Sequence, residues 1–379
     1  MILRRIMTIL GTRPELIKMS RVLAVLDATF DHILVHTGQN YDYELNQIFF
    51  DDLKIRKPDF FLDAAGENAM VTIANVLVRA HALLEQERPE AVLIYGDTNS
   101  GLACLPAKRL KIPIFHFEAG NRCFDARVPE EINRKIIDHT SDVNFVLTEH
   151  ARRYLLAEGL PADRVIKSGS HMPEVLDHAR AGIAASTVRE RLGLEEGRYV
   201  LVSAHREENV DQPAKLAALV EALGRIAAEY RVPVIVSTHP RTRVRIKAAG
   251  LSNSAEDVRL LPPFGFFDYV RLQQDALCVI SDSGTISEEA ALLGFPAVTL
   301  RDAHERPEGQ DAGAVTVVSR LSVDVILDAI RVTLATHGDR NTGARRVLDY
   351  EAGRVSQTIA RVISGYIDMV NRVVWSKPQ

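Results

Sequence analysis

The chain has 379 residues, enough for two domains of ordinary size, and its 46% hydrophobic and 25% charged residues are typical of a globular protein. A net charge of −4 offers no basic surface for nucleic acid, and three widely spaced cysteines indicate reduced thiols instead of a disulfide framework. Because it shows no signal-peptide layout, no apolar run near the roughly 20 residues of a membrane helix and no CxxC or HExxH motif, we expect a cytoplasmic protein without a metal.

Short apolar runs alternate with helical patterns along the chain, which favours parallel sheets built from βαβ units. The predicted strands are 6–10, 32–37, 91–95, 113–117, 143–147, 164–166, 199–203, 234–237, 277–280 and 297–300. The predicted helices include 71–86, 99–110, 149–158, 213–229 and a long one from 355 to about 374. The pattern pauses near 169–171, so we predict domains at 1–170 and 171–359, with a C-terminal helix of about 360–379 completing the first.

The first predicted strand ends in the turn Gly11-Thr-Arg-Pro-Glu15, where backbone amides can approach an anion. The turn lacks the GxGxxG pattern, so no dinucleotide fingerprint is present. Arg13 and Lys18 flank the start of the next helix and suit a phosphate or a carboxylate partner. A structural surface pair is the alternative interpretation.

Two further strand ends carry acids. Asp97 follows the strand 91–95 and precedes a helix, where it can act as a ligand-binding residue or as an N-cap. The stretch 113–134 begins as a buried strand and enters a helix with Pro129 in its first turn. Its charged residues are Glu118, Arg122, Asp125, Arg127, Glu130, Glu131 and Arg134. The stretch is either a reactive site or a solvated loop whose acids suit the helix dipole.

In the second half, histidines follow two predicted strands. His205 comes after 199–203 and His239 after 234–237. One histidine at such a place is usually structural, but two at equivalent ends of one sheet favour a functional role.

The segment Ser281-Asp-Ser283-Gly284-Thr285 starts a helix with small and hydroxyl residues, so its free amides can bind phosphate without a lysine. Thr285 with Glu288 also fits a capping box. Glu289 is better placed for sugar hydroxyls. Phe264 and Tyr269 can stack on a base, although core packing is the commoner fate of aromatic residues. Arg306 lies in the charged run 301–308 that follows another strand.

Five motifs in this order are similar to those of one family. They are Gly-Thr-Arg-Pro-Glu at 11–15, Gly-Asp-Thr at 96–98, Glu-Ala-Gly at 118–120 with Pro-Glu-Glu-Ile-Asn-Arg at 129–134, His-Arg-Glu-Glu-Asn at 205–209, and Asp-Ser-Gly at 282–284 with Glu288-Glu289 and Glu-Arg-Pro-Glu at 305–308. Together they closely resemble the non-hydrolysing UDP-N-acetylglucosamine 2-epimerases. The stretches 37–44 and 118–125 resemble the capsule and O-antigen subgroup that converts UDP-2-acetamido-2,6-dideoxy-L-talose into UDP-N-acetyl-L-fucosamine.

The resemblance implies an α/β fold of two Rossmann-like domains with a central cleft, similar to glycosyltransferase-B. It also implies a cytoplasmic homodimer that uses no metal or nicotinamide. The catalytic residues implied are Asp97, Glu118, Glu130 and His205. Those implied to bind substrate are Arg13, Lys18, Arg134, His239, Phe264, Tyr269, Ser283, Gly284, Thr285, Glu289 and Arg306.

The family's reaction eliminates UDP from C1 as C2 loses its proton, forms a 2-acetamidoglycal, and adds UDP back after reprotonation on the other face. The substrate expected is UDP-N-acetylglucosamine or the 6-deoxy-L-sugar pair, as a precursor of surface polysaccharide. Three alternatives stay open: a UDP-sugar-dependent glycosyltransferase, a hydrolysing epimerase, and a nucleotide-sugar-binding protein without catalysis.

Overall fold

The computed structural model describes residues 3–38, 52–250, 257–301, 305–338 and 346–378. Contacts divide the chain into two compact units. The first unit consists of Met1–His178 together with Leu348–Gln379, and the second unit consists of Ala179–Val347. The expected boundaries were 170/171 and 359/360. The first observed boundary falls inside α7 (Met172–Ala185), and the second falls just before η3 (Leu348–Glu351). All of α16 (Val355–Val373) therefore belongs to the first unit.

The described part of the first unit contains a seven-stranded sheet in which neighbouring strands are parallel. Its order is β3 (Phe60–Phe61), β2 (Asp31–His36), β1 (Arg5–Leu10), β4 (Ala91–Tyr95), β5 (Ile114–Ala119), β6 (Val143–Val146) and β7 (Val165–Lys167). The chain runs outward from β1 in one direction and then returns to β4 on its other side. Such a switch point opens a crevice at the carboxyl ends of the strands, where open α/β sheets bind ligands.

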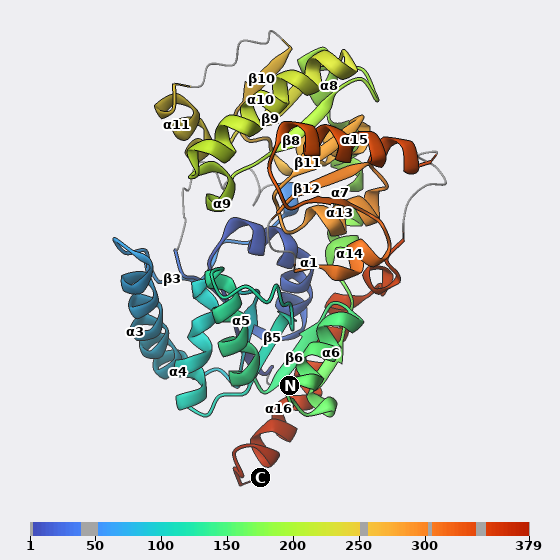
Figure 1. Cartoon of the computed structure of the whole chain (residues 1–379). Coiled ribbons are helices and arrows are strands. Elements are labelled where there is room, and N and C mark those ends of the chain that lie inside the picture. The colour runs from blue at the N-terminus through green and yellow to red at the C-terminus, as the bar shows by residue number, and fades with distance from the viewer. Residues whose placement is uncertain (1–2, 39–51, 251–256, 302–304, 339–345, 379) are drawn as a thin grey trace. The chain divides into compact units, whose positions relative to one another are not determined.

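The helices of the first unit cover both faces of this sheet (Figure 1). They are α1 (Arg13–Thr29), α3 (Ala69–Glu87), η1 (Asn99–Ala103), α4 (Cys104–Arg109), α5 (Pro129–Thr140), α6 (Glu149–Ala157), η2 (Ala162–Arg164), α7, η3 and α16. One set contains α3, α4 and α5 in contact in turn, and in the other α1 packs against α16. The C-terminal helix therefore returns to the beginning of the chain.

Strand β1 shows why the central strands are apolar throughout. Met7 and Ile9 belong to one core cluster together with Val76 of α3, while Ile6 and Leu10 point to the other face and are equally buried. A strand covered on both faces needs apolar side chains at successive positions instead of alternate ones.

The second unit repeats the arrangement with six parallel strands among its described residues. The order is β10 (Val258–Leu261), β9 (Val234–Ser237), β8 (Val200–Ser203), β11 (Cys278–Ser281), β12 (Ala297–Leu300) and β13 (Thr316–Val318). The helices are α8 (Val188–Leu192), α9 (Glu207–Val210), α10 (Pro213–Tyr230), α11 (Pro240–Ala248), α12 (Phe266–Asp275), α13 (Ile286–Leu293), α14 (Pro307–Asp311) and α15 (Val323–Thr336). Here the switch point lies between β8 and β11.

The predicted fold class, two Rossmann-like α/β domains, is confirmed by these two sheets. Three strands were not predicted, namely β3, β10 and β13. The expected helix 99–110 is a 3₁₀ helix, η1, followed by the short α4. Residues 39–44 of the stretch 37–44, which suggested a subgroup, lie outside the described residues.

Candidate active site

The acids predicted in the first unit gather at the carboxyl edge of its sheet. Asp97 follows β4, and Glu118 lies in β5, the next strand of the sheet. Glu118 was expected just after a strand that ends at 117. Instead β5 continues to Ala119, with an irregular register against β6 between Phe117 and Ala119.

Glu118 occupies this irregularity with a left-handed backbone, at φ 70°. Its carboxylate accepts a hydrogen bond of 3.0 Å from Lys18 Nζ, and both side chains are only about one-tenth exposed. A non-glycine residue with positive φ costs free energy, and such residues cluster at functional sites where the surroundings hold them in place. Lys18 therefore has a buried carboxylate partner, so the surface-pair alternative is wrong for it.

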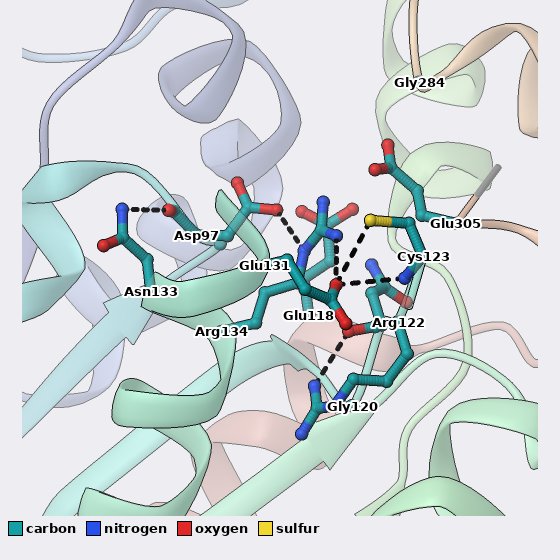
Figure 2. Close-up of polar contacts among 12 residues, drawn as sticks. Asp97, Glu118, Gly120, Arg122, Cys123, Glu131, Asn133, Arg134, Gly284 and Glu305 are labelled. Carbon is teal, nitrogen blue, oxygen red and sulfur yellow. Dashed lines mark hydrogen bonds and ion pairs between the residues drawn. The ribbon is translucent and has the colours of Figure 1, made fainter. Parts of the chain in front are cut away.

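Asp97 is fixed by helix α5 (Figure 2). Arg134 Nε donates to Asp97 Oδ2 at 2.8 Å, and the Asn133 side-chain amide donates to the Asp97 carbonyl oxygen at 3.0 Å. The N-cap position of the following helix η1 is Thr98, so the N-cap alternative for Asp97 is wrong. Asp97 is half-buried, and its pair with the Arg134 guanidinium fixes its side chain at the sheet edge.

The two glutamates of the Pro129-Glu-Glu motif have different surroundings. Glu131 is buried and accepts hydrogen bonds from the backbone amides of Cys123 and Phe124 and from Arg134. Burial opposes its ionisation, but the bonds from Cys123 and Arg134 outweigh burial and lower the pKa of Glu131. Glu130 is half-buried and forms no hydrogen bond or ion pair with the described residues. Glu131 thus positions the loop and Arg134, while Glu130 keeps its carboxylate available.

A buried polar network that sequence reasoning missed supports Asp97 and Glu118. His116 binds Asp138 through Nδ1 and donates from Nε2 to the Gly96 carbonyl, both at 2.8 Å. Asp138 also accepts from the Gly120 amide and from Arg122, whose side chain is fully buried. The network therefore holds the residue before Asp97 and the turn after Glu118. A histidine in an apolar strand and an acid near the end of a helix give no sequence signal of this pairing.

Arg13 begins α1 beside the Gly11 turn and is half-buried, and burial lowers its pKa. Glu15, two residues later, was noted only as part of a motif. It is 4% exposed, and its carboxylate accepts the amides of Gly11 at 2.6 Å and Thr12 at 3.1 Å. This arrangement is a capping box, with Thr12 as the N-cap.

In the second unit Asp282 organises the loop after β8. Its fully buried carboxylate accepts the backbone amides of His205 and Arg206, each at 2.9 Å, and the side-chain amide of Asn209 at 3.1 Å. His205 is thereby fixed while its side chain remains 42% exposed, with Nδ1 3.3 Å from Asp282 Oδ1. The His239 ring centre lies 6.0 Å from that of His205. The two strand-end histidines therefore meet at one edge of this sheet.

The Ser283-Gly-Thr285 turn precedes α13 and is held from below. Arg306 Nε donates to the Gly284 carbonyl at 3.0 Å, and Ser283 and Thr285 share a hydroxyl–hydroxyl hydrogen bond of 2.9 Å. The expected capping box between Thr285 and Glu288 is wrong, because the Thr285 side chain makes no cap hydrogen bond. Arg306 is buried, so in this structure its guanidinium shapes the turn.

A buried ion cluster lies against the same turn. Arg301 makes a two-point contact with Glu305, and Arg206 lies 3.8 Å from Glu305. A Cβ on Gly284 would come within 2.5 Å of Glu305 Oε1, which Arg301 binds, so a side chain here would displace the Glu305 carboxylate.

The aromatic candidates of the second unit are partly buried. Phe264 and Tyr269 both pack against the core cluster that contains Leu201 and Val279, which agrees with the alternative that aromatic residues here serve core packing. Burial and the nearby Glu289 carboxylate raise the pKa of Tyr269 above its usual range. Glu289 accepts a hydrogen bond of 2.5 Å from Gln273 of α12. Phe264 lies in the loop before α12, Tyr269 in α12 and Glu289 in α13.

Two kinds of feature are absent from the described residues. No group of three or more His, Cys, Asp or Glu side chains among them is arranged to hold a metal ion. None of the helices seen in these parts of the chain is long and apolar enough to cross a membrane.

Known proteins resemble this chain over nearly its whole length. The sequence profile of the family described as UDP-N-acetylglucosamine 2-epimerase matches residues 25–364. The structure of UDP-N-acetylglucosamine 2-epimerase from Rickettsia bellii is 51% identical, with a TM-score of 0.92 over 99% of this chain and 100% of that one. The Methanocaldococcus jannaschii enzyme, solved with UDP-GlcNAc and UDP, is 32% identical, with a TM-score of 0.86 over 95% and 99% of the two chains.

A relative with another named substrate is also similar. The UDP-2,3-diacetamido-2,3-dideoxy-D-glucuronate 2-epimerase of Pseudomonas aeruginosa is 38% identical over 335 residues, which cover 87% of this chain and 92% of that one. MurG of Acinetobacter baumannii is 13% identical with a TM-score of 0.56 over 96% and 99% of the chains, a likeness that shows the glycosyltransferase-B-like fold alone. The whole-length matches, together with the strand-edge acids and the histidine and serine loops, establish that this chain is an isomerase of the UDP-N-acetylglucosamine 2-epimerase family.

Proposed function

We propose that this chain is a non-hydrolysing 2-epimerase of a UDP-2-acetamido sugar. The observation that supports it most is the Glu118–Lys18 pair, a carboxylate held in a left-handed strand irregularity beside the Asp97–Arg134 pair. Strained backbone that presents a paired acid at the carboxyl edge of a parallel sheet indicates catalysis more than stability. The sugar is UDP-N-acetylglucosamine, or the 6-deoxy-L-sugar pair of the subgroup that the sequence resembles.

The chemistry explains the need for several acids. C2 of a 2-acetamido sugar has no adjacent carbonyl, so its proton is very weakly acidic and a leaving group on C1 must depart with it. A base takes the C2 proton as the C1–O bond to UDP breaks, which gives a 2-acetamidoglycal and bound UDP. An acid then returns a proton to the opposite face of C2, and a UDP oxygen bonds to C1 again. Two proton-transfer groups on opposite faces suffice for this cycle.

We assign the proton transfers to Asp97, Glu118 and Glu130. Lys18 and Arg134 hold the first two acids in place and balance their charge. Glu130 is the acid without a cation of its own among the described residues, which suits a group that must exchange a proton.

The second unit is proposed to hold UDP. The exposed His205 would support the departing diphosphate, with His239 beside it. The remaining contacts of this unit are proposed as follows: Ser283, Gly284 and Thr285 on phosphate, Glu289 on ribose, Phe264 and Tyr269 near uracil, and Arg306 behind the Gly284 turn. Asp282 acts indirectly, since it fixes the His205 backbone.

The test is incubation with UDP-N-acetylglucosamine alone in deuterated water. The epimerase predicts deuterium at C2 of both epimers without net release of UDP. A hydrolysing enzyme would instead accumulate one UDP for each turnover, and a glycosyltransferase or a binding protein would incorporate no deuterium. Running UDP-2-acetamido-2,6-dideoxy-L-talose in parallel decides between the two sugars.

We further propose that the enzyme works as a cytoplasmic homodimer that supplies precursors of surface polysaccharide. Light scattering of the purified chain tests the dimer directly, since a mass near twice 42.1 kDa is expected. Loss of capsule or O-antigen in a deletion strain, restored by the wild-type gene and not by one encoding Glu118→Gln, tests the role in polysaccharide supply.

A further inference from the structure

Glu15 is a buried carboxylate that is only half explained by the capping box. Its Oε2 accepts the amides of Gly11 and Thr12, which completes the helix cap. Its Oε1 is also buried and makes no hydrogen bond of good geometry among the described residues, although the Thr98 side chain lies near enough to act on the pKa of Glu15. A buried polar atom that is poorly satisfied is costly, so the cap alone does not explain why this oxygen lies here.

Glu15 Oε1 and the Glu118 carboxylate lie near one point beside Gly96. Both Glu15 Oε1 and Glu118 Oε2 approach one point, the place a Cβ on Gly96 would occupy, at 3.8 and 3.7 Å. Gly96 has a left-handed backbone with φ 69° and carries no side chain to separate the two acids. Lys18, which binds the other oxygen of Glu118, follows Glu15 by three positions on α1 and therefore lies on the same face of that helix.

The charges around Glu15 do not balance if every acid is ionised. The carboxylates from three elements are Glu15 on α1, Asp97 after β4 and Glu118 in β5, and the cations that bind them are Lys18 and Arg134. Arg134 is shared between Asp97 and Glu131. Burial, reinforced by the charge of Asp97 and opposed by the Gly11 amide, raises the pKa of Glu15 to about 7.

We propose that Glu15 is a positioning residue of the active site, which sets the charge of the Glu118–Lys18 pair by carrying or releasing its own proton. With Glu15 protonated, one lysine balances one carboxylate, Glu118. With Glu15 ionised, a second negative charge lies near Glu118, and that charge favours the protonated form of Glu118. The proton on Glu15 is not transferred to the sugar. The inference rests on the proposed epimerase reaction, because that reaction gives Glu118 its proton-transfer role.

The experiment compares the pH dependence of C2 deuterium incorporation in the wild type and Glu15→Gln. Glutamine keeps an oxygen for the Gly11 and Thr12 amides but cannot ionise. The readout is the ratio of the two rates per folded molecule, with the folded fraction of each protein measured at every pH, because the stability of the variant relative to the wild type also depends on pH. We expect the ratio to change by about fivefold or more between about pH 6 and pH 8.5, with the glutamine variant relatively faster at high pH.

The matched control is Asp142→Asn. Asp142 is also buried, also accepts a backbone amide (from Ile114) and also binds a lysine (Lys108), but it precedes β6 at the opposite edge of the sheet. The rate of C2 deuterium incorporation by Asp142→Asn, divided by that of the wild type, should not vary with pH.

Each result decides the matter. A Glu15→Gln ratio that is constant with pH overturns the inference and leaves Glu15 as a helix cap. If this variant does not fold, the wild type alone is sufficient, because a rate without any inflection between about pH 6 and pH 8.5 also overturns it. A wild type that incorporates no deuterium from any UDP-sugar at any pH refutes the proposed function instead, so the two failures are distinguishable.

Discussion

Replacing Glu15 and His36 should change the pH dependence of stability of the first unit in opposite directions. Both side chains are buried at the carboxyl edge of the sheet, and both are pushed toward their neutral forms. Burial raises the pKa of Glu15 from 4.5 to about 7 and lowers the pKa of His36 from 6.5 to about 4. His36 Nδ1 also accepts the Gly38 amide at 2.9 Å, which requires that nitrogen to be unprotonated.

The sign of each effect follows from proton linkage. Folded Glu15 holds its proton more tightly than unfolded Glu15, so its contribution is full below pH 4.5 and is lost as the pH rises to about 7. Folded His36 resists protonation, so its contribution is full above pH 6.5 and is lost as the pH falls toward about 4. Each pKa unit is worth about 1.4 kcal/mol, so each group changes the free energy of unfolding by about 3 kcal/mol across nearly the same window.

The assay is urea unfolding of the wild type, Glu15→Gln, His36→Asn and the double variant between about pH 4.5 and pH 7.5. The chain has one tryptophan, Trp375, and it belongs to the first unit, so its fluorescence reports on the unit that contains both groups. Relative to the wild type, Glu15→Gln should gain about 3 kcal/mol as the pH rises through the window, and His36→Asn should lose about as much. In the double variant the two trends should cancel.

At each pH the free energy of unfolding of the wild type is subtracted from that of the variant, so that the titration of every other group cancels. If both single variants follow the wild-type curve at a constant offset, to within about 0.5 kcal/mol, the linkage argument for these two groups is wrong. A slope in Glu15→Gln of the opposite sign would show that folded Glu15 is ionised at neutral pH, which would also contradict the charge count at Glu118.

Three further predictions concern single contacts. Arg122→Ala leaves the Asp138 carboxylate buried without its guanidinium partner, so it should lower the free energy of unfolding by about 3–5 kcal/mol. Arg127→Ala removes an exposed ion pair from the same loop and should lower it by less than about 1 kcal/mol. Equal losses in urea unfolding would contradict the burial argument. Gly284→Ala places a Cβ 2.5 Å from Glu305 Oε1, which Arg301 holds in place. Overpacking of this kind costs about 1–3 kcal/mol, so the affinity for UDP measured by calorimetry should fall by about tenfold or more. An unchanged affinity would show that the turn relaxes freely. Asp282 accepts hydrogen bonds from three N–H groups, and the amide of Asp282→Asn can satisfy them only in part. The affinity for UDP should therefore fall by at least about tenfold. A loss of turnover with unchanged UDP affinity would show that His205 acts in the chemical step alone.

The strands that sequence patterns missed share a position in the fold. β3, β10 and β13 are all edge strands of their sheets, with two, four and three residues. A central strand such as β1 is apolar at successive positions because helices cover both of its faces, and that run is visible in the sequence. A short and partly exposed edge strand can have a composition that does not separate it from a loop, although the edge strand β7 was predicted as 164–166.

The site was predictable in location and less so in detail. Asp97 and His205 were placed correctly just after strands, because small and polar residues interrupt the apolar runs there, whereas Glu118 lies inside the end of β5 and not after it. The local patterns could not show that Glu118 continues a strand with positive φ, because that conformation depends on contacts from α5 and α1. Neither could they separate Glu130 from Glu131, which are neighbours in one motif and differ only in which side of α5 they face.

The buried network beneath the acids explains how the unfavourable conformation at Glu118 is maintained. A left-handed non-glycine residue costs about 1–3 kcal/mol, and hydrogen bonds to charged groups contribute about as much each. Asp138 binds His116, the Gly120 amide and Arg122, so three contacts converge on the segment that includes Glu118. Because His116 also holds the Gly96 carbonyl, one carboxylate far from solvent couples the positions of Asp97 and Glu118. Two acids on separate strands can therefore keep a fixed spacing, which proton transfer at a single carbon requires.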